Sequence, residues 1–401
     1  MRIEDLRIEK PAGKPRLTAR VVWEDSERAA CEVYFETEND FADALAPLPD
    51  AFLAASLSPA LWAGEERIHV EGEVCPELLE NLQVVTRVFQ HWFNLGNTAA
   101  RIEARPRSHV EAASGRAAVF LTGGLDSLAA LRANRLCFPR EHPRWLKDGI
   151  IVYGLEVEDE QPFNYVLQAL TELAKDAELT LVPVSSNVRC LNPDWTFWYN
   201  AHMGPALCAV AHALGRRLSS ATIATDYDVP HMVPHGSHPL IEPNFGSHTL
   251  KIRCHGLTMS RLTKARLVAE WPPALHNLRV CNKPDLYQPG RLNCGECEKC
   301  VRTMLELVAV GAFERAPVFV RRDLSAELIN QLYMPPAVEP YYEELIAPLT
   351  EVGRSDLAVG IGQALARTRR ETGLVGRLRK FDRDRLNGSL ASLKRTVAAR
   401  G

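Results

Sequence analysis

One stretch, residues 116–131 (RAAVFLTGGLDSLAAL), constrains the fold of this chain more than any other. Its first part, Ala117–Leu121, is apolar and contains β-forming residues, which predicts a buried strand. The chain then turns at Thr122-Gly123-Gly124, and Leu125–Ala133 has the composition of a helix. The sequence therefore predicts a strand, a sharp turn and a helix in immediate succession.

A turn of this kind is suited to hold a phosphate group. Two glycines permit positive φ angles and let a ligand approach the backbone closely. The amides of the turn and of Asp126 and Ser127 would surround a helix N-terminus, where the macrodipole favours anions. The hydroxyls of Thr122 and Ser127 add hydrogen-bond donors. The alternative is an ordinary strand–turn–helix unit with a Gly-Gly turn and no ligand.

Length and composition limit the class of protein. A chain of 401 residues exceeds one ordinary hydrophobic core, so we expect two or three domains. The net charge of −3 provides no overall attraction for nucleic acid. Residues 1–5 do not begin a signal peptide, and no apolar run approaches the length of a membrane span. With ten cysteines, these features predict a cytoplasmic protein whose thiols are more suited to metal than to disulfides.

Three domains are predicted along the chain. Residues 1–112 form a strand-rich α+β accessory domain in which we find no catalytic constellation. Its expected elements are strands at Arg16–Val22, Ala30–Glu36 and Arg67–Val70, helices at Phe41–Leu48 and Leu78–Trp92, and a polar linker at Ile102–Gly115. Residues 116–310 form the central domain, and residues 311–401 form a helical C-terminal extension. The last helix of that extension, 374–397, is amphipathic and basic, and either docks on its own domain or binds RNA, anionic lipid or a protein.

The central domain alternates strands with helices. Strands are expected at Ala117–Leu121, Gly149–Leu155, Thr180–Val184 and Ser220–Ala224, which predicts an α/β fold with a parallel sheet and right-handed crossovers. Ligands bind beyond the carboxyl ends of the strands in such sheets. Polar or turn residues follow each strand end, and we expect them to converge with the Gly-Gly turn: Leu155, Glu156, Ser185, Ser186 and Asp226.

Two segments of the central domain have more than one interpretation. The aromatic run at 194–202 forms either a stacking wall for a planar substrate or the packing of a helix onto the sheet. The loop at 227–250 contains four histidines, and loops of this length are usually functional. Its irregular spacing matches no standard metal-ligand pattern, so we expect hydrogen-bonding histidines there rather than a histidine metal site.

Arg261 and Lys264 lie three residues apart in a predicted helix that ends before Pro272, so both occupy one helical face. Two cations near the predicted phosphate site would neutralise its negative charge. The alternative is a solvated basic face.

Four cysteines have the spacing of a metal site. Cys294, Cys297 and Cys300 form a C-x2-C-x2-C run, and Cys281 precedes them by twelve intervening residues. Four thiolates satisfy tetrahedral Zn²⁺ and leave no open position. We predict a structural zinc site; an iron–sulfur cluster and unligated thiols are the alternatives.

These motifs together resemble a known family. Thr122–Ser127 resembles the SGGxDS loop of the N-type ATP pyrophosphatase (PP-loop) superfamily, with Thr in place of the first Ser. Leu262–Ala265 and residues 294–302 are similar to the LTKA and CGxCxxCxxR motifs of its 7-cyano-7-deazaguanine synthase (QueC-like) branch. The match covers roughly residues 116–308. It implies an adenine nucleotide alpha hydrolase-like fold with helices on both faces of the sheet. It also implies that the protein binds ATP and Mg²⁺ in addition to zinc, and that it forms a homodimer.

The resemblance also implies an activity, that of an AMP-forming carbon–nitrogen ligase. The enzyme would adenylate a carboxylate or amide oxygen with release of pyrophosphate, and an amine or ammonia would then displace AMP. The acceptor would be a small molecule or a peptide. Catalytic roles fall on Asp126, Ser127, Arg261 and Lys264. The residues expected to hold ATP are Thr122, Gly123, Gly124, Leu125, Asp126, Ser127, Leu155, Glu156 and Asp226.

Departures from the family pattern leave other functions open. The chain adds a domain on each side of the match, and Thr225-Asp226-Tyr227-Asp228 follows the fourth strand in place of a nucleobase-recognising sequence. The substrate therefore need not be a deazaguanine. One alternative is a PP-loop sulfur transferase acting on RNA or a small molecule. Another is a non-catalytic nucleotide-binding protein.

Overall fold

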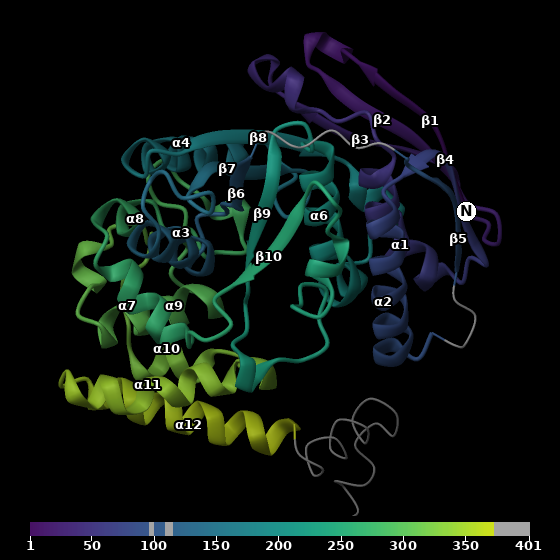
Figure 1. The fold of residues 1–401 in the computed structure, drawn as a ribbon. Coiled ribbons are helices and arrows are strands. Elements are labelled where there is room, and N and C mark those ends of the chain that lie inside the picture. Colours follow the sequence, from purple (N-terminus) through teal and green to yellow (C-terminus); the bar gives the residue numbers. More distant parts are fainter. Residues whose placement is uncertain (96–99, 109–114, 373–401) are drawn as a thin grey trace, which may run out of the picture.

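The computed structural model describes residues 1–95, 100–108 and 115–372, and Figure 1 shows their arrangement. They form an α/β protein built on one mixed, mostly parallel ten-stranded sheet, with helices at the C-terminal end. The strands are β1 (Arg2–Glu9), β2 (Arg16–Val22), β3 (Cys31–Thr37), β4 (Arg67–Val74), β5 (Arg101–Pro106), β6 (Arg116–Phe120), β7 (Leu146–Tyr153), β8 (Thr180–Ser186), β9 (Leu218–Ala224) and β10 (Lys251–His255). The predicted helix at 374–397 lies outside the described residues.

Helices cover both faces of the parallel part of this sheet, whereas β1 to β5 pack against helices on one face (Figure 1). The helices are α1 (Asp50–Ala63), α2 (Pro76–Phe93), α3 (Leu125–Cys137), α4 (Glu160–Asp176), α5 (Trp195–Phe197), α6 (Met203–Ala213), α7 (Arg261–Ala269), α8 (Pro272–Asn277), α9 (Glu298–Ala309), α10 (Ala326–Gln331), α11 (Glu339–Glu351) and α12 (Ser355–Thr372). Within the described part of the chain, no helix combines the length and the apolar character that a membrane crossing requires.

The order of the strands is β10-β9-β6-β7-β8-β3-β2-β1-β4-β5. The first five strands in this order are parallel; β6 to β9 correspond to the four predicted strands, whereas β10 was not predicted. Strand β3 then pairs antiparallel with β8, with Phe35 opposite Ser186, and β1 and β2 continue the sheet in antiparallel fashion. The sheet therefore runs without interruption from the predicted central domain into residues 1–106, and it is mixed rather than purely parallel.

The strand that precedes the Gly-Gly turn lies between two hydrophobic cores. On β6, Ala118 and Phe120 face the core that contains α1, α2 and α6. Ala117 and Val119 face the core formed with α3, α4 and α7 to α9. Successive side chains of a strand point to opposite faces, so the uniformly apolar sequence of β6 follows from its burial on both sides.

The structure corrects several expectations for the first hundred residues. The predicted helix at Phe41–Leu48 is a short 3-10 helix at Asn39–Ala44, and α1 begins only at Asp50. Helix α1 is buried almost all around, so it lacks the apolar periodicity that marks a surface helix. Strand β1 was not predicted, because charged residues alternate through it. The first five residues of the predicted linker, 102–106, belong to the edge strand β5.

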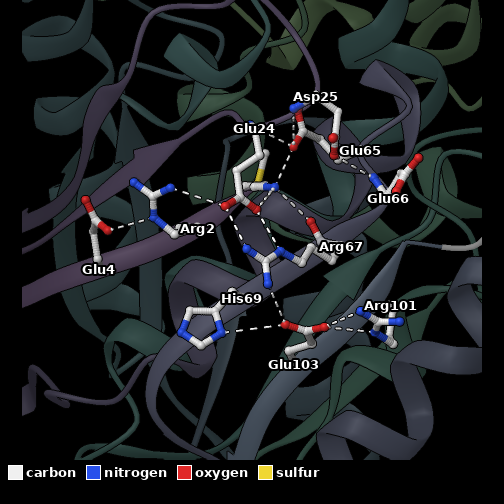
Figure 2. A network of polar contacts seen from close by, with 11 residues as sticks. Arg2, Glu4, Glu24, Asp25, Glu65, Glu66, Arg67, His69, Arg101 and Glu103 are labelled. Atoms are coloured by element: carbon white, nitrogen blue, oxygen red, sulfur yellow. Dashed lines mark hydrogen bonds and ion pairs between the residues drawn. The ribbon is translucent and has the colours of Figure 1, made fainter.

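Figure 2 shows ion pairs across β1, β4 and β5. We name five of these residues the N-terminal charge network: Arg2, Glu24, Arg67, Arg101 and Glu103. Arg67 binds both carboxylate oxygens of Glu24, with distances of 3.0 Å from Nε and 2.9 Å from Nη2. Arg67 also contacts Glu103, which pairs with Arg101, and Arg2 contacts Glu24 at 3.2 Å. The arginine side chains are between 39% and 74% exposed, so this network is in contact with solvent.

Candidate active site

The two glycines of the turn between β6 and α3 adopt different conformations. Gly123 has a φ of +77°, whereas Gly124 has an extended conformation and caps the N-terminus of α3. Only Gly123 therefore uses the positive φ that we expected of both glycines. A Cβ atom on Gly123 would also lie 3.4 Å from side-chain atoms of Arg279 and Leu170, so a larger residue would strain both the backbone and its packing.

The two hydroxyl groups of the turn lie together at the start of α3. The Oγ atoms of Thr122 and Ser127 are 3.3 Å apart. The Gly124 amide donates to Thr122 Oγ1 at 3.2 Å, and Ser127 Oγ donates to the Gly124 carbonyl at 3.0 Å. Threonine thus occupies the first position of the motif with its hydroxyl directed into the turn, where the serine of the family motif would lie.

Asp126 joins the turn to helix α7 through what we name the buried charge cluster, Asp126, Arg261, Lys264 and Glu306. Asp126 Oδ1 lies 2.7 Å from Lys264 Nζ, and Asp126 Oδ2 lies 2.9 Å from an Nη1 of Arg261. Arg261 Nε contacts Glu306 on α9 at 2.9 Å. Lys264 also donates to the Thr225 carbonyl, at the end of β9, at 2.6 Å. The cluster therefore connects the turn, α7, α9 and the end of a central strand.

Burial determines the charge state of this cluster. Lys264 is 2% exposed and Arg261 is 8% exposed, so these two residues do not form a solvated basic face. Burial by itself raises the pKa of Asp126, but the charges of Lys264 and Arg261 outweigh it and lower the pKa to about 2. Burial raises the pKa of Glu306, which the charge of Arg261 opposes. Asp126 is thus a carboxylate that stays charged at neutral pH and is held between two cations.

The turn borders a cavity of about 350 Å³, which is within the size range of small-molecule sites. Most of the predicted nucleotide-binding residues line it: Thr122, Gly124, Leu125, Asp126, Ser127, Leu155, Glu156 and Asp226. Arg261 lines it too, whereas Gly123 and Lys264 do not; the Lys264 ammonium donates to the carboxylate of Asp126 and to the Thr225 carbonyl. Ser185 and Ser186 are not among the lining residues.

Three further cations in this cavity were not assigned from the sequence. Arg279, Lys299 and Arg302 all line it. The Arg279 amide donates to the Gly123 carbonyl at 2.8 Å, and its guanidinium donates to the Thr122 carbonyl at 3.2 Å. Arg302 is the arginine that closes the CGxCxxCxxR-like motif, so the sequence contained a signal for it. Arg279 had no such signal, because only the folded chain brings it against the turn.

Aromatic residues also line the cavity, and one of them, Tyr341, has the guanidinium of Arg302 5.2 Å from its ring centroid. These residues are Trp198, Tyr199, Tyr227 and Tyr341. Trp198 is 1% exposed and also packs against the core, whereas Tyr199 is partly exposed, so the aromatic run both packs and borders the cavity. Tyr341 comes from α11 and donates to the Asp226 carbonyl at 3.1 Å. The C-terminal helices therefore contribute a wall of the cavity, a contribution that the sequence did not indicate.

The histidine loop also reaches the cavity. His235 and Ser237 line it, and Ser237 hydrogen-bonds the carboxyl of Glu242. Burial raises the pKa of Glu242 to about 7. His238 packs edge-on against Trp92 with ring centroids 4.7 Å apart. Histidines of this loop make hydrogen bonds: His231 Nδ1 contacts Asp228, and His238 Nδ1 accepts from the Leu240 amide at 3.0 Å.

The four predicted cysteines come together beside the cavity. Cys281, Cys294, Cys297 and Cys300 place their Sγ atoms within 4.8 Å of one another. The distances from Cys281 to Cys297 and from Cys294 to Cys300 are 3.9 and 3.8 Å. Ligands about 2.3 Å from a tetrahedral zinc ion lie roughly 3.8 Å apart, so the spacing of this group is consistent with a bound zinc ion.

Backbone geometry shapes this cysteine group. Gly295 has a φ of +80°, and a Cβ atom there would lie 1.9 Å from the Arg321 carbonyl oxygen. The amides of Glu296 and Cys297 donate to Cys294 Sγ at 3.4 and 3.3 Å, as they would to a thiolate. Cys281 also lines the cavity, so the metal group and the candidate active site share a wall.

Comparison with models of protein families, with curated proteins and with solved structures gives no significant match. Functional inference for this chain therefore depends on its motifs and on the geometry described above.

Proposed function

We propose that the protein is an ATP-dependent, AMP-forming ligase that activates a carboxylate or amide oxygen for attack by an amine or ammonia. The observation that carries this proposal is the turn between β6 and α3, whose hydroxyls and helix N-terminus border a cavity that Arg261, Arg279, Lys299 and Arg302 also line. Cations and a helix N-terminus around one space favour a polyanion.

The proposed placement of ATP follows from the distribution of charge. The polyphosphate would lie against the turn and the four cations. Both carboxylate oxygens of Asp126 already contact Lys264 and Arg261, so Asp126 would fix the turn rather than bind metal. Glu156 and Asp226 are the cavity carboxylates that would hold the Mg²⁺ that accompanies the phosphates. Leu155 and the apolar residues near it would contact the adenosine.

In the proposed reaction, an oxygen of the acceptor attacks the α-phosphorus and the bond to the β-phosphate oxygen breaks. Pyrophosphate leaves, and Arg261, Arg279 and Arg302 stabilise its charge. The amine or ammonia then attacks the activated carbon, loses a proton, and AMP leaves. The protein contributes positioning and charge stabilisation, which require no nucleophilic side chain. The aromatic wall at Tyr199, Tyr227 and Tyr341 would bind the acceptor, either a small molecule or the end of a peptide.

A structural zinc ion in the cysteine group belongs to the same proposal. It would fix the start of α9, which carries Arg302 and Glu306, and the segment around Cys281 that follows Arg279. Metal analysis of the purified protein should then give one zinc per chain and no iron.

The test of the activity is the nucleotide product. We expect the purified protein, given Mg²⁺–ATP and a small-molecule extract of cells, to produce AMP and pyrophosphate in equal amounts. Ser127→Ala should reduce this rate by 10-fold or more, about the effect of losing a hydrogen-bond donor to a transferring phosphate. Thr171→Ala, an exposed hydroxyl on α4, is the matched control and should leave the rate unchanged. Formation of ADP, or ATP binding with no AMP from any extract, would contradict the proposal.

A PP-loop sulfur transferase is the second candidate, because Cys281 lines the cavity and a cysteine there can carry sulfur. Its substrate would be an RNA or a small molecule. Iron and a brown colour in the purified protein, together with sulfur incorporation that Cys281→Ser abolishes, would favour it over the ligase.

A further inference from the structure

Two cysteines outside the metal group lie close together in the fold. Cys31 begins β3 and Cys190 lies in the 3-10 helix η3 (Val188–Leu191), 159 residues later. Their Sγ atoms are 3.0 Å apart, and Cys190 donates a hydrogen bond to Cys31. Cys190 is exposed and Cys31 is partly exposed, so small reagents can reach the pair. Neither residue belongs to the proposed active site.

Other contacts hold the two thiols in place. The side chain of Asn187, just before η3, accepts from the Tyr34 amide at 2.9 Å and donates to the Glu32 carbonyl at 2.7 Å. Arg28 donates to the Leu191 carbonyl at 3.0 Å. These three hydrogen bonds fasten both ends of η3 to the segment that contains Cys31. The proximity of the sulfurs is therefore fixed by the surrounding backbone and not by the flexibility of two side chains.

The residue next to Cys190 contacts the wall of the cavity. Arg189 donates to the Leu155 carbonyl at 3.3 Å, and Leu155 lines the cavity. Its guanidinium lies 3.6 Å from the ring centroid of Trp195 and 5.7 Å from that of Trp198, another lining residue. A covalent link at Cys190 would therefore restrain a segment that supports one side of the candidate active site.

We propose that Cys31 and Cys190 are a modification site that reversibly forms an intramolecular disulfide with a low-molecular-weight disulfide as oxidant. One thiol loses its proton and attacks a sulfur of the oxidant, which releases one reduced thiol and leaves a mixed disulfide. The second protein thiolate attacks that mixed disulfide and releases the other reduced thiol. The protein loses two electrons and two protons, and the oxidant gains them. A disulfide requires sulfurs about 2.05 Å apart, so the pair must close by only about 1 Å.

The chemistry of the pair supports this reaction. The hydrogen bond from Cys190 lowers the pKa of Cys31 and so increases its thiolate fraction. A thiolate, not a thiol, attacks a disulfide. Cys137 provides the contrast. It is an exposed, free cysteine at the end of α3, and within the described residues its thiol makes no hydrogen bond to another cysteine.

The experiment equilibrates the full-length protein in glutathione buffers of increasing oxidised fraction, blocks free thiols by alkylation, and maps the peptides by mass spectrometry. We expect one linked peptide that joins Cys31 to Cys190, lighter than the reduced peptides by two hydrogen atoms, which a reductant removes completely. Cys137→Ser should leave the linked peptide unchanged. Cys31→Ser and Cys190→Ser should each abolish it and leave a glutathione adduct on the remaining cysteine.

Two results would overturn the proposal. One is alkylation of both Cys31 and Cys190 under conditions in which Cys137 carries glutathione. The other is glutathione on each of the two cysteines of the wild-type chain without a linked peptide.

Hydrogen exchange tests the effect on the cavity wall: amides of residues 187–192 should exchange more slowly in the linked form. Unchanged exchange there would contradict the restraint of η3. None of these results depends on the ligase proposal, because no nucleotide is present.

Discussion

The buried charge cluster and the N-terminal charge network are both built from arginines and carboxylates, but they differ in their access to water. Asp126 and Glu24 have pKa values lowered to about 2, the first by the charges of Lys264 and Arg261 against the opposing effect of burial, the second chiefly by hydrogen bonds from Arg67. Lys264 is 2% exposed, whereas Arg67 is 41% exposed. Water and salt therefore screen the second network and not the first. Similar pKa shifts thus indicate a positioned site in one region and a solvated sheet surface in the other.

Removal of metal should produce the largest difference between the two regions. The cysteine group anchors α9, which carries Glu306 of the buried charge cluster. Structural zinc contributes about 10 kcal/mol to the folding of isolated zinc-binding peptides. We expect Cys300→Ser, or a strong chelator, to lower the unfolding temperature and to speed hydrogen exchange in α9 but not in β1 or β4. Cys137→Ser is the control, and equal exchange changes in both regions would contradict this distinction.

Loss of one partner from the buried charge cluster should have the next largest effect. Lys264→Met leaves Asp126 with a single cation, and breaking a buried ion pair costs about 3–5 kcal/mol. We therefore expect a decrease of that size in the free energy of unfolding, measured by urea denaturation, and loss of AMP formation. Arg266→Met, an exposed position on the same helix, should change stability by less than about 0.5 kcal/mol. An equally small effect of Lys264→Met would contradict the prediction that the ion pair between Lys264 and Asp126 stabilises the folded protein.

Acid should separate the two regions further. The pKa of Asp126 falls from 3.8 in the unfolded chain to about 2 in the folded protein. Its contribution to stability is therefore complete above pH 4 and disappears as the pH falls through 4 toward 2, with a total of about 2 kcal/mol. Asp126→Asn should flatten the stability profile in that window, at low and at high salt. If high salt alone removed the acid dependence of the wild type, the exposed network would be its source.

Substitutions in the N-terminal charge network should have the smallest effect. Glu24→Gln removes the bidentate partner of the exposed Arg67 and a partner of the Met1 amine, which keeps Glu65, and pairs with exposed arginines contribute at most about 1 kcal/mol. We expect a decrease in unfolding free energy of that size at low salt and a smaller one at high salt. Arg20→Gln, an exposed residue on β2 outside the network, is the control. A decrease as large as that of Lys264→Met would show that this network is as important for stability as the buried cluster.

The sequence predicted those parts that short-range chemistry determines. The strand–turn–helix unit, the parallel strands around it and the meeting of Cys281 with the C-x2-C-x2-C run all follow from local pattern or ligand spacing. Helix α1 was missed because complete burial removes amphipathic periodicity, and β1 was missed because its charged residues pair across an exposed sheet face. Arg279 and Tyr341 were missed because only tertiary folding places them at the cavity, and neither has a local signal.

The pairing of β3 with β8 has a consequence for any attempt to isolate the part of the protein that contains the Gly-Gly turn. Without residues 1–106, the backbone amides and carbonyls along β8 that β3 now satisfies would face solvent as an open sheet edge. Open edges recruit strands from other molecules. A shortened polypeptide that begins near Arg116 would therefore be expected to self-associate, even with its turn, its cavity and its cysteines intact.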